Sequence, residues 1–183
     1  MSHPLAPGFL IALPHLRDAN FRRSVILLFQ ADDQGAIGVV VNQESSLLLS
    51  DLCQDHSITY AGDGEKLVRR GGPVQPEHGV VLYGVEHQDA DGEPVVEGLH
   101  LSASKNTLTR LCNLKQGRFQ CFAGYAGWGP GQLEREIDEG TWLAATADAR
   151  LVLERRPEEV WSATLQGMGI DPAVLVSGGG GRA

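Results

Sequence analysis

SVILLFQADDQGAIGVVVNQ, residues 24–43, is the most informative segment of this chain. Two runs of aliphatic and β-branched residues, 24–30 and 37–43, flank a polar segment in which Asp33 and Gly35 supply turn chemistry. The pattern predicts a β-hairpin. Because the apolar residues do not alternate with polar ones, we expect both faces of the hairpin to be buried.

Further strand patterns lie on both sides of this hairpin. Before it, GFLIAL (8–13) is a short apolar run that Pro14 should terminate, since proline cannot donate to a strand ladder. After it, VVLYGV (80–85) and VVEGLHLS (95–102) predict a second hairpin through the turn-rich segment between them. Three more strand patterns are RFQCFAGY (118–125), TWLAAT (141–146) and LVLERR (151–156).

Helical patterns are most frequent in the second half of the chain. After Ser104, which can cap a helix, Leu108, Leu111 and Cys112 fall at helical spacing and predict a helix from Lys105 to about Leu114. The other helical segments are 47–55 with Ser50 as cap, 130–140, a helix from Pro157 with Val160, Trp161, Leu165 and Met168 on one face, and a last turn or two from Asp171. Hairpins followed by helices predict an α+β fold with a largely antiparallel sheet or a partly closed barrel.

Length and charge limit the classes of protein to which the chain can belong. With 183 residues, 42% of them apolar, we expect one domain over residues 1–176 and a flexible glycine-rich tail over 177–183. A net charge of −8 repels polyanions, so direct binding to nucleic acid is not expected. No apolar run approaches the roughly 18 residues that span a bilayer. We therefore expect a cytoplasmic protein that does not enter the membrane.

The cysteines and histidines do not form a recognisable reactive or metal-binding pattern. Cys53, Cys112 and Cys121 are odd in number, widely spaced and surrounded by apolar residues, which favours reduced thiols in the core. The six histidines include no HxxxH pair, and no CxxC is present to complete a zinc site. We assign no metal ligand, no cofactor and no catalytic residue from the sequence.

The glycine-rich segment GYAGWGPGQLEREI, residues 124–137, allows two interpretations. A strand, a glycine cluster and a helix in this order imitate a dinucleotide-binding unit. However, the spacing is GxGxG, Pro130 removes a donor that a phosphate needs, and Glu134 and Glu136 place carboxylates near the helix start. The favoured interpretation is a turn in which the Gln132 side chain reaches back to cap the helix.

Four blocks of this sequence together resemble the AlgH/YqgE family of bacterial proteins. They are PHLRDANFRRSVILLF, AIGVVVNQ, RRGGPVQPEHGVVLY and GYAGWGPGQLEREIDEGTWLAA, in the same order as in the family, and the resemblance covers roughly residues 8–172. It implies a compact α+β fold with a bifurcated, partly barrel-like sheet surrounded by helices. The name AlgH implies a role in regulating transcription of alginate synthesis, and the resemblance brings no established catalytic residue or cofactor.

Polar and glycine residues of these blocks lie at strand ends and corners, where they either converge on a ligand or tie loops to the backbone. Tying loops is the favoured interpretation, since buried loop backbone must find partners. The candidate ligand-binding residues are Asn20, Arg23, Asn42, Arg69, Gly71, Gly72, Gln75, Trp128 and Gln132.

Two functions remain open at this point. We expect a non-catalytic binding or regulatory protein that acts through a protein partner or a small ligand. The alternative is an enzyme, a hydrolase or a nucleotide-using protein, in which Arg23, Arg69 and the two glycine corners form an anion pocket.

Overall fold

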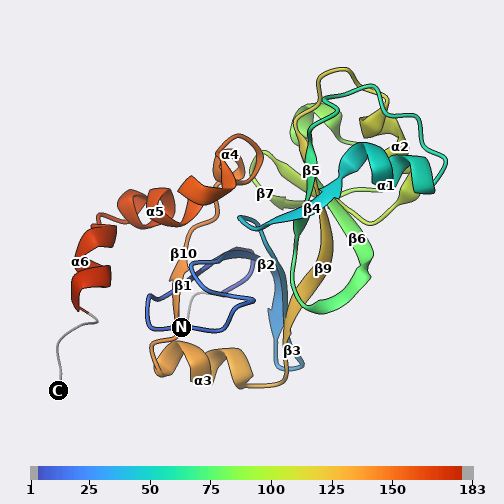
Figure 1. Cartoon of the computed structure of the whole chain (residues 1–183). Helices are drawn as coiled ribbons and strands as arrows, with labels where there is room; N and C mark the ends of the chain where they lie inside the picture. Colours follow the sequence, from blue (N-terminus) through green and yellow to red (C-terminus); the bar gives the residue numbers. More distant parts are fainter. Residues whose placement is uncertain (1–3, 179–183) are drawn as a thin grey trace.

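The computed structural model describes residues 4–178, which form one large sheet with helices packed around it (Figure 1). The strands are β1 (Gly8–Ala12), β2 (Val25–Asp32), β3 (Gly35–Val40), β4 (Glu44–Leu48), β5 (Leu67–Arg70), β6 (Val74–Gly84), β7 (Glu93–Val96), β8 (Leu99–Ser102), β9 (Phe119–Trp128) and β10 (Trp142–Ala145). The helices are α1 (Leu49–Asp55), the 3-10 turn η1 (Val85–His87), α2 (Lys105–Cys112), α3 (Gln132–Asp138), α4 (Ala149–Leu153), α5 (Pro157–Gly167) and α6 (Pro172–Gly178).

The sheet is curled and bifurcated around its long strand β9. Its order is β10-β1-β2-β3-β9-β6-β8-β7, and β5 joins β9 from the side and carries β4. All pairings are antiparallel except that of β5 with β9. The predicted α+β class with a largely antiparallel, partly barrel-like sheet is therefore confirmed.

One edge of β9 serves two different strands in succession. β5 pairs with β9 at Phe122 and Ala123, and β3 pairs with it from Ala126 to Trp128. Between these two contacts lies Gly71, whose N–H donates to the carbonyl of Ala123 and whose own carbonyl accepts from Val40. Gly71 thus occupies the fork where the sheet divides.

The fork requires two backbones to touch, which explains its glycines. A Cβ on Gly72 would lie 2.2 Å from the backbone of Tyr125, and a Cβ on Gly124 would lie 2.3 Å from the carbonyl oxygen of Gly72. Both glycines also have positive φ, 151° at Gly72 and 75° at Gly124. Side chains at these positions would force the two backbones apart.

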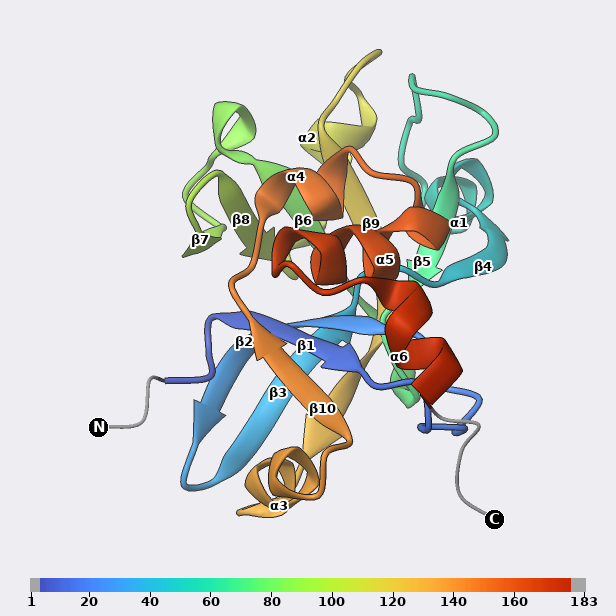
Figure 2. The same cartoon turned by 90° about the vertical axis from the view of Figure 1, so that its left-hand side faces the viewer.

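The predicted hairpin of residues 24–43 forms, and it is buried on both faces in the half away from its turn, whereas residues 29–35 are half-buried or exposed. Val25 and Leu27 of β2 pack under α4 and α5, whereas Ile26 and Leu28 face a second cluster that contains Leu133 of α3. Figure 2 shows α4 and α5 in front of the sheet and α3 at its lower end. A third cluster lies under α1 and α2, so the helices cover the sheet in three separate places.

The segment LVLERR (151–156) was expected to be a strand, and this expectation is wrong. The chain forms α4 there, and the side chain of Asp148 caps this helix by accepting from the N–H of Arg150 at 2.9 Å. Its apolar residues suit a helix as well as a strand, because three of them recur at helical spacing and are buried: Ala149, Val152 and Leu153.

Several element boundaries also differ from expectation. Residues 95–102 form two strands, β7 and β8, because Gly98 adopts a positive φ of 82° and turns the chain between them. β9 continues to Trp128 instead of ending at residue 125. The side chain of Ser50 does not cap α1, whose N-cap is Leu48, and Met168 is 39% exposed at the end of α5.

The cap of α2 is as predicted, whereas the first two residues of the predicted flexible tail are helical. Ser104 caps α2 as predicted by accepting from the N–H of Asn106. The predicted tail, residues 177–183, begins within α6, and its residues 179–183 lie outside the described residues. Between residues 4 and 178, no helix has both the length and the apolar character needed to cross a membrane.

We predict that Gly124→Ala destabilises the protein by about 2–4 kcal/mol, because the new methyl group meets a backbone oxygen in addition to the strain of positive φ. Gly140→Ala is the matched control, since Gly140 has a φ of 76° and open space around a Cβ. It should cost only about 1 kcal/mol. Urea denaturation monitored by circular dichroism gives both values, and equal losses would contradict the fork as a close backbone crossing.

Candidate functional site

The segment that follows β9 is held together by the carboxylate of Glu136 in α3. One oxygen, Oε2, accepts from the indole N–H of Trp128 at 2.9 Å and from that of Trp142 at 2.8 Å. The other, Oε1, accepts from the side-chain amide of Gln132 at 2.9 Å. The Gln132 oxygen in turn accepts from the N–H of Gly129 at 3.0 Å, which is the contact predicted from the sequence. The helix itself begins later than predicted, at Gln132 instead of residue 130, so this bond closes the turn before α3 and does not cap the helix.

These contacts give Trp128 and Gln132 structural partners. The rings of Trp128 and Trp142 meet edge to face at 5.9 Å, and Phe21 meets Trp142 in the same way at 5.7 Å. The N–H of Gly129, which a phosphate at this corner would use, already donates to Gln132. This geometry supports the interpretation of the glycine-rich segment as a turn.

We predict that Glu136→Ala lowers the free energy of unfolding by about 2–4 kcal/mol, because it leaves two buried indole donors without an acceptor. Glu136→Gln should cost only about 1 kcal/mol, since one amide oxygen can still accept from both indoles. Glu134→Ala on the same helix is an exposed control with an expected loss below about 1 kcal/mol. Urea midpoints of the three variants test this order, and a harmless Glu136→Ala would contradict the role of this carboxylate.

Arg69 lies at the fork and is buried, with 4% of its surface exposed. Its Nη1 donates to the carbonyls of Val41 at 2.8 Å and Val152 at 2.9 Å, and so ties β5 to the end of β3 and to α4. Burial lowers the pKa of Arg69 to about 10, against the opposing attraction of Glu44. The guanidinium remains charged at neutral pH and is bound to backbone carbonyls.

The loop between β1 and β2, residues 13–24, carries Arg17, Arg22 and Arg23, and we call it the arginine loop. Asn42 clamps its end, because its Oδ1 accepts from the N–H of Val25 at 2.8 Å and its Nδ2 donates to the carbonyl of Arg23 at 2.9 Å. A third bond joins the side chain of Gln43 to the carbonyl of Asn20 at 2.8 Å.

The nine candidate residues therefore fall into three groups and do not share one cavity. Asn20, Arg23 and Asn42 meet at the arginine loop. Arg69, Gly71 and Gly72 lie at the fork, next to the exposed residue Gln75 on β6, and Trp128 and Gln132 lie at the far end of β9. A groove between α1 and α2 and a cavity between β10, α4 and α5 are lined by other residues.

A groove of about 530 Å³ opens between α1 and α2, over the part of the sheet formed by β5, β6 and β9. Its floor is apolar and contains buried residues of the third core cluster: Ile58, Val68, Val81 and Cys121. Leu52 and His56 form one wall, and Lys105 and Leu108 form the opposite one. We call this feature the apolar groove.

A bulge in β6 makes a further wall of the apolar groove. Val74 pairs with Tyr125 and Gly79 pairs with Ala123, so residues 75–78 are looped out of the ladder. Gln75 in this bulge has a φ of 44°, and Ser57 after α1 has a φ of 57°. These two residues do not line the groove themselves, but each is the neighbour in sequence of residues that do: His56 and Ile58 beside Ser57, and Pro76 beside Gln75.

The thiol on the floor of the groove is held in its neutral form. Burial raises the pKa of Cys121 to about 12, although the charge of Lys66 opposes this shift. The thiol of Cys53 donates to that of Cys112 at 3.3 Å, and burial raises both of their pKa values. The three cysteines are free and buried, as the sequence predicted, and they present apolar surface rather than thiolate nucleophiles at neutral pH.

A larger cavity of about 1110 Å³ lies between β10, α4 and α5, and it is more polar. It is lined by three arginines, Arg118, Arg150 and Arg155, each of which already pairs with a carboxylate. An incoming anion would have to compete with these carboxylates, so the cavity is a poorer anion site than its arginines suggest. No group of three or more histidine, cysteine or acidic side chains within residues 4–178 is arranged to hold a metal ion.

The apolar groove was not foreseen from the sequence. Leu52 and Leu108 were correctly placed on the inner faces of their helices, but both face a gap between α1 and α2 instead of each other. The width of that gap depends on where the two helices sit over the sheet, which no local pattern encodes. The one local signal is the proline and glycine content of residues 71–79, which is typical of an interrupted strand.

Comparison with known proteins places the chain in a family. A family model described as AlgH-like matches residues 9–173. UPF0301 proteins of Myxococcus xanthus and Stenotrophomonas maltophilia (strain R551-3) are each 42% identical, the first over 96% of this chain and 97% of its own length, the second over 91% and 90%.

A solved structure agrees with this assignment, and a second one shares the fold. The solution structure of the AlgH protein from Pseudomonas aeruginosa matches with a TM-score of 0.76 and 32% identity, over 100% of this chain and 99% of that one. A crystal structure of a Corynebacterium diphtheriae protein shares the fold, with a TM-score of 0.75 and 24% identity over 96% of this chain and 92% of that one. This chain belongs to the AlgH-like family.

Proposed function

We propose that this chain is a non-catalytic binding protein and that the apolar groove between α1 and α2 is its ligand site. The observation that carries the proposal is the open gap over buried core residues: Val68 is 1% exposed and Cys121 is 5% exposed, yet both line a groove of about 530 Å³. A volume in this range and a predominantly apolar lining are typical of sites for small ligands.

The chemistry of the lining favours binding over catalysis. A neutral thiol and aliphatic side chains offer van der Waals contact and no activated nucleophile. Ionisable groups lie at the rim of the groove. There the Nδ1 of His78 lies 3.4 Å from the Oε1 of Glu77, and both side chains are largely exposed. Such an arrangement buries an apolar ligand and leaves polar groups of that ligand near water.

A regulatory role fits a protein of this kind. The resemblance to AlgH implies participation in the control of transcription, and a protein that responds to a ligand can exert such control through a partner. Ligand binding in the groove can affect a distant part of the fold, because the floor of the groove includes β9, and β9 also pairs with β3 at its far end.

The proposal is tested with anilinonaphthalene sulfonate, a dye whose fluorescence rises in apolar sites. We predict that the wild type binds a single dye and that Ala123→Leu, which fills the floor of the groove, weakens binding by about tenfold, equivalent to about 1.4 kcal/mol. Leu108→Gln, which makes one wall polar, should weaken it too. Ala147→Leu is the matched control, because Ala147 lines the larger polar cavity.

Equal dye affinity of the Ala123→Leu and Ala147→Leu variants would show that the groove is not the binding site.

A further inference from the structure

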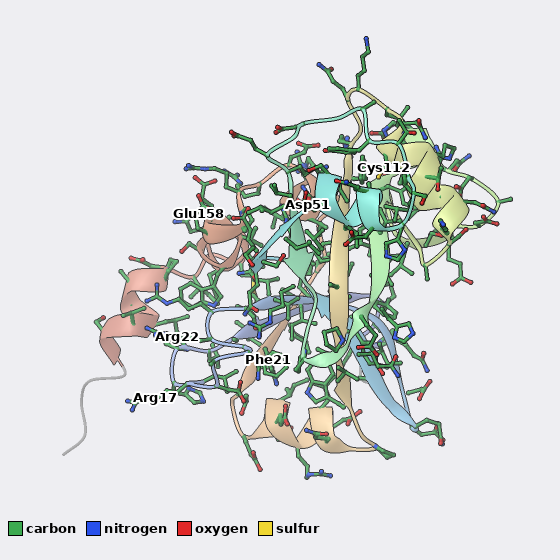
Figure 3. The ribbon with its side chains drawn as sticks, turned by 45° about the vertical axis from the view of Figure 1, so that its right-hand side comes forward. Arg17, Phe21, Arg22, Asp51, Cys112 and Glu158 are labelled. Atoms are coloured by element: carbon green, nitrogen blue, oxygen red, sulfur yellow. The ribbon has the colours of Figure 1, made fainter. Side chains whose placement is uncertain are left out.

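We propose that the arginine loop is a recognition surface for a carboxylate-rich segment of a partner protein. This surface is separate from the apolar groove and does not depend on the ligand proposed for it. It is formed by the side chains of Arg17, Arg22 and Arg23, all of which are exposed. Figure 3 shows Arg17 and Arg22 on the outer side of the loop and Phe21 further inward.

The loop is built rigidly, which reduces the entropy lost when a partner binds. The carbonyl of Asp18 accepts from the N–H groups of Phe21 and Arg22, and its carboxylate accepts from the N–H of Asn20 at 2.8 Å. Phe21 anchors the loop against Trp142. The turns and this anchor hold the backbone of the loop in place before any partner arrives.

Arg23 is held in a strained conformation that presents its side chain. Its φ is 50°, a region that residues with a Cβ seldom occupy, and the clamp of Asn42 on its carbonyl fixes this geometry. The guanidinium lies over the ring of Trp161, 5.2 Å from its centroid. A guanidinium stacked in this way keeps the donors along its edge available for a carboxylate.

These arginines have no carboxylate partner, a property that they share with Arg69, Arg70 and Arg135, whereas five other arginines within residues 4–178 are paired. Within residues 4–178, no carboxylate oxygen lies within 4.0 Å of the guanidinium nitrogens of Arg17, Arg22 or Arg23. In contrast, acidic side chains pair with Arg110, Arg118, Arg150, Arg155 and Arg156. The acids of the neighbouring helix α5, Glu158 and Glu159, are taken up by Arg156. The arginine loop is therefore a local positive surface on a chain of net charge −8.

The size of the surface favours a short acidic peptide segment over nucleic acid. Nucleic acid interfaces typically bury about 1,000–2,500 Å² of a broadly basic protein face. Here three arginines stand on a single loop, and the remainder of the chain is acidic and repels a long phosphate backbone. A few carboxylates on a partner suffice to pair with three guanidinium groups, each of which can bind one carboxylate through two N–H donors.

The test uses a fluorescein-labelled decaglutamate peptide and measures its fluorescence anisotropy with the full-length protein. We expect binding that weakens steeply as salt rises, and a loss of affinity of about tenfold or more in R17Q/R22Q/R23Q. The matched control R150Q/R155Q/R156Q removes the same charge from arginines that are already paired, and it should bind nearly as the wild type does. Thermal unfolding of both variants confirms that they fold.

Three outcomes would overturn the proposal. The first is an absence of binding by the wild type at low salt. The second is an equal loss in the two triple variants, which would reduce the effect to net charge. The third is tighter, loop-dependent binding of short duplex DNA carrying the same label, which would assign the surface to nucleic acid.

The double variant R17Q/R22Q retains Arg23, and it should therefore keep part of the affinity for the peptide.

Discussion

Two strands, β3 and β5, share one edge of β9, and the rest of the fold depends on how this edge is divided between them. The edge is divided, with β5 paired at Phe122 and Ala123 and β3 paired beyond Gly124. Such a division is possible only where side chains are absent at the junction, since the two backbones approach within the space of a methyl group. The apolar groove lies over β5, β6 and β9 next to this junction, and the arginine loop is tied to Asn42 and Gln43, which follow β3.

Those parts of the fold that depend on neighbours in sequence could be predicted. The hairpin of residues 24–43 follows from two apolar runs around a turn, and Ser104 caps α2 through a bond to a residue two positions away. The error at residues 151–156 has an equally local origin, because five to six residues of mixed apolar character satisfy a strand and a short helix alike. There, the cap at Asp148 and burial beneath α5 decide the outcome.

The candidate site was less predictable, because its parts are joined across the fold. The bond from the N–H of Gly129 to the side chain of Gln132 could be predicted, because the two residues are three positions apart. The role of Glu136 could not, because it depends on Trp142, which belongs to the next strand, β10. Asn42 was recognised as a polar motif residue, but its bonds to Arg23 and Val25 exist only because the hairpin brings them together. The apolar groove has no sequence signature, since it is a space between helices whose separation is set by the sheet.

The pairing of β1 with β10 has a consequence for synthesis of the chain. Phe9 lies opposite Ala145, so the outer edge of β1 stays without its partner until most of the polypeptide has left the ribosome. The hairpin can close early on the inner edge of β1, but the exposed edge of an apolar strand invites pairing with other chains during that interval. We therefore expect nascent chains of this fold to be most prone to mispairing with other chains before residue 145 emerges.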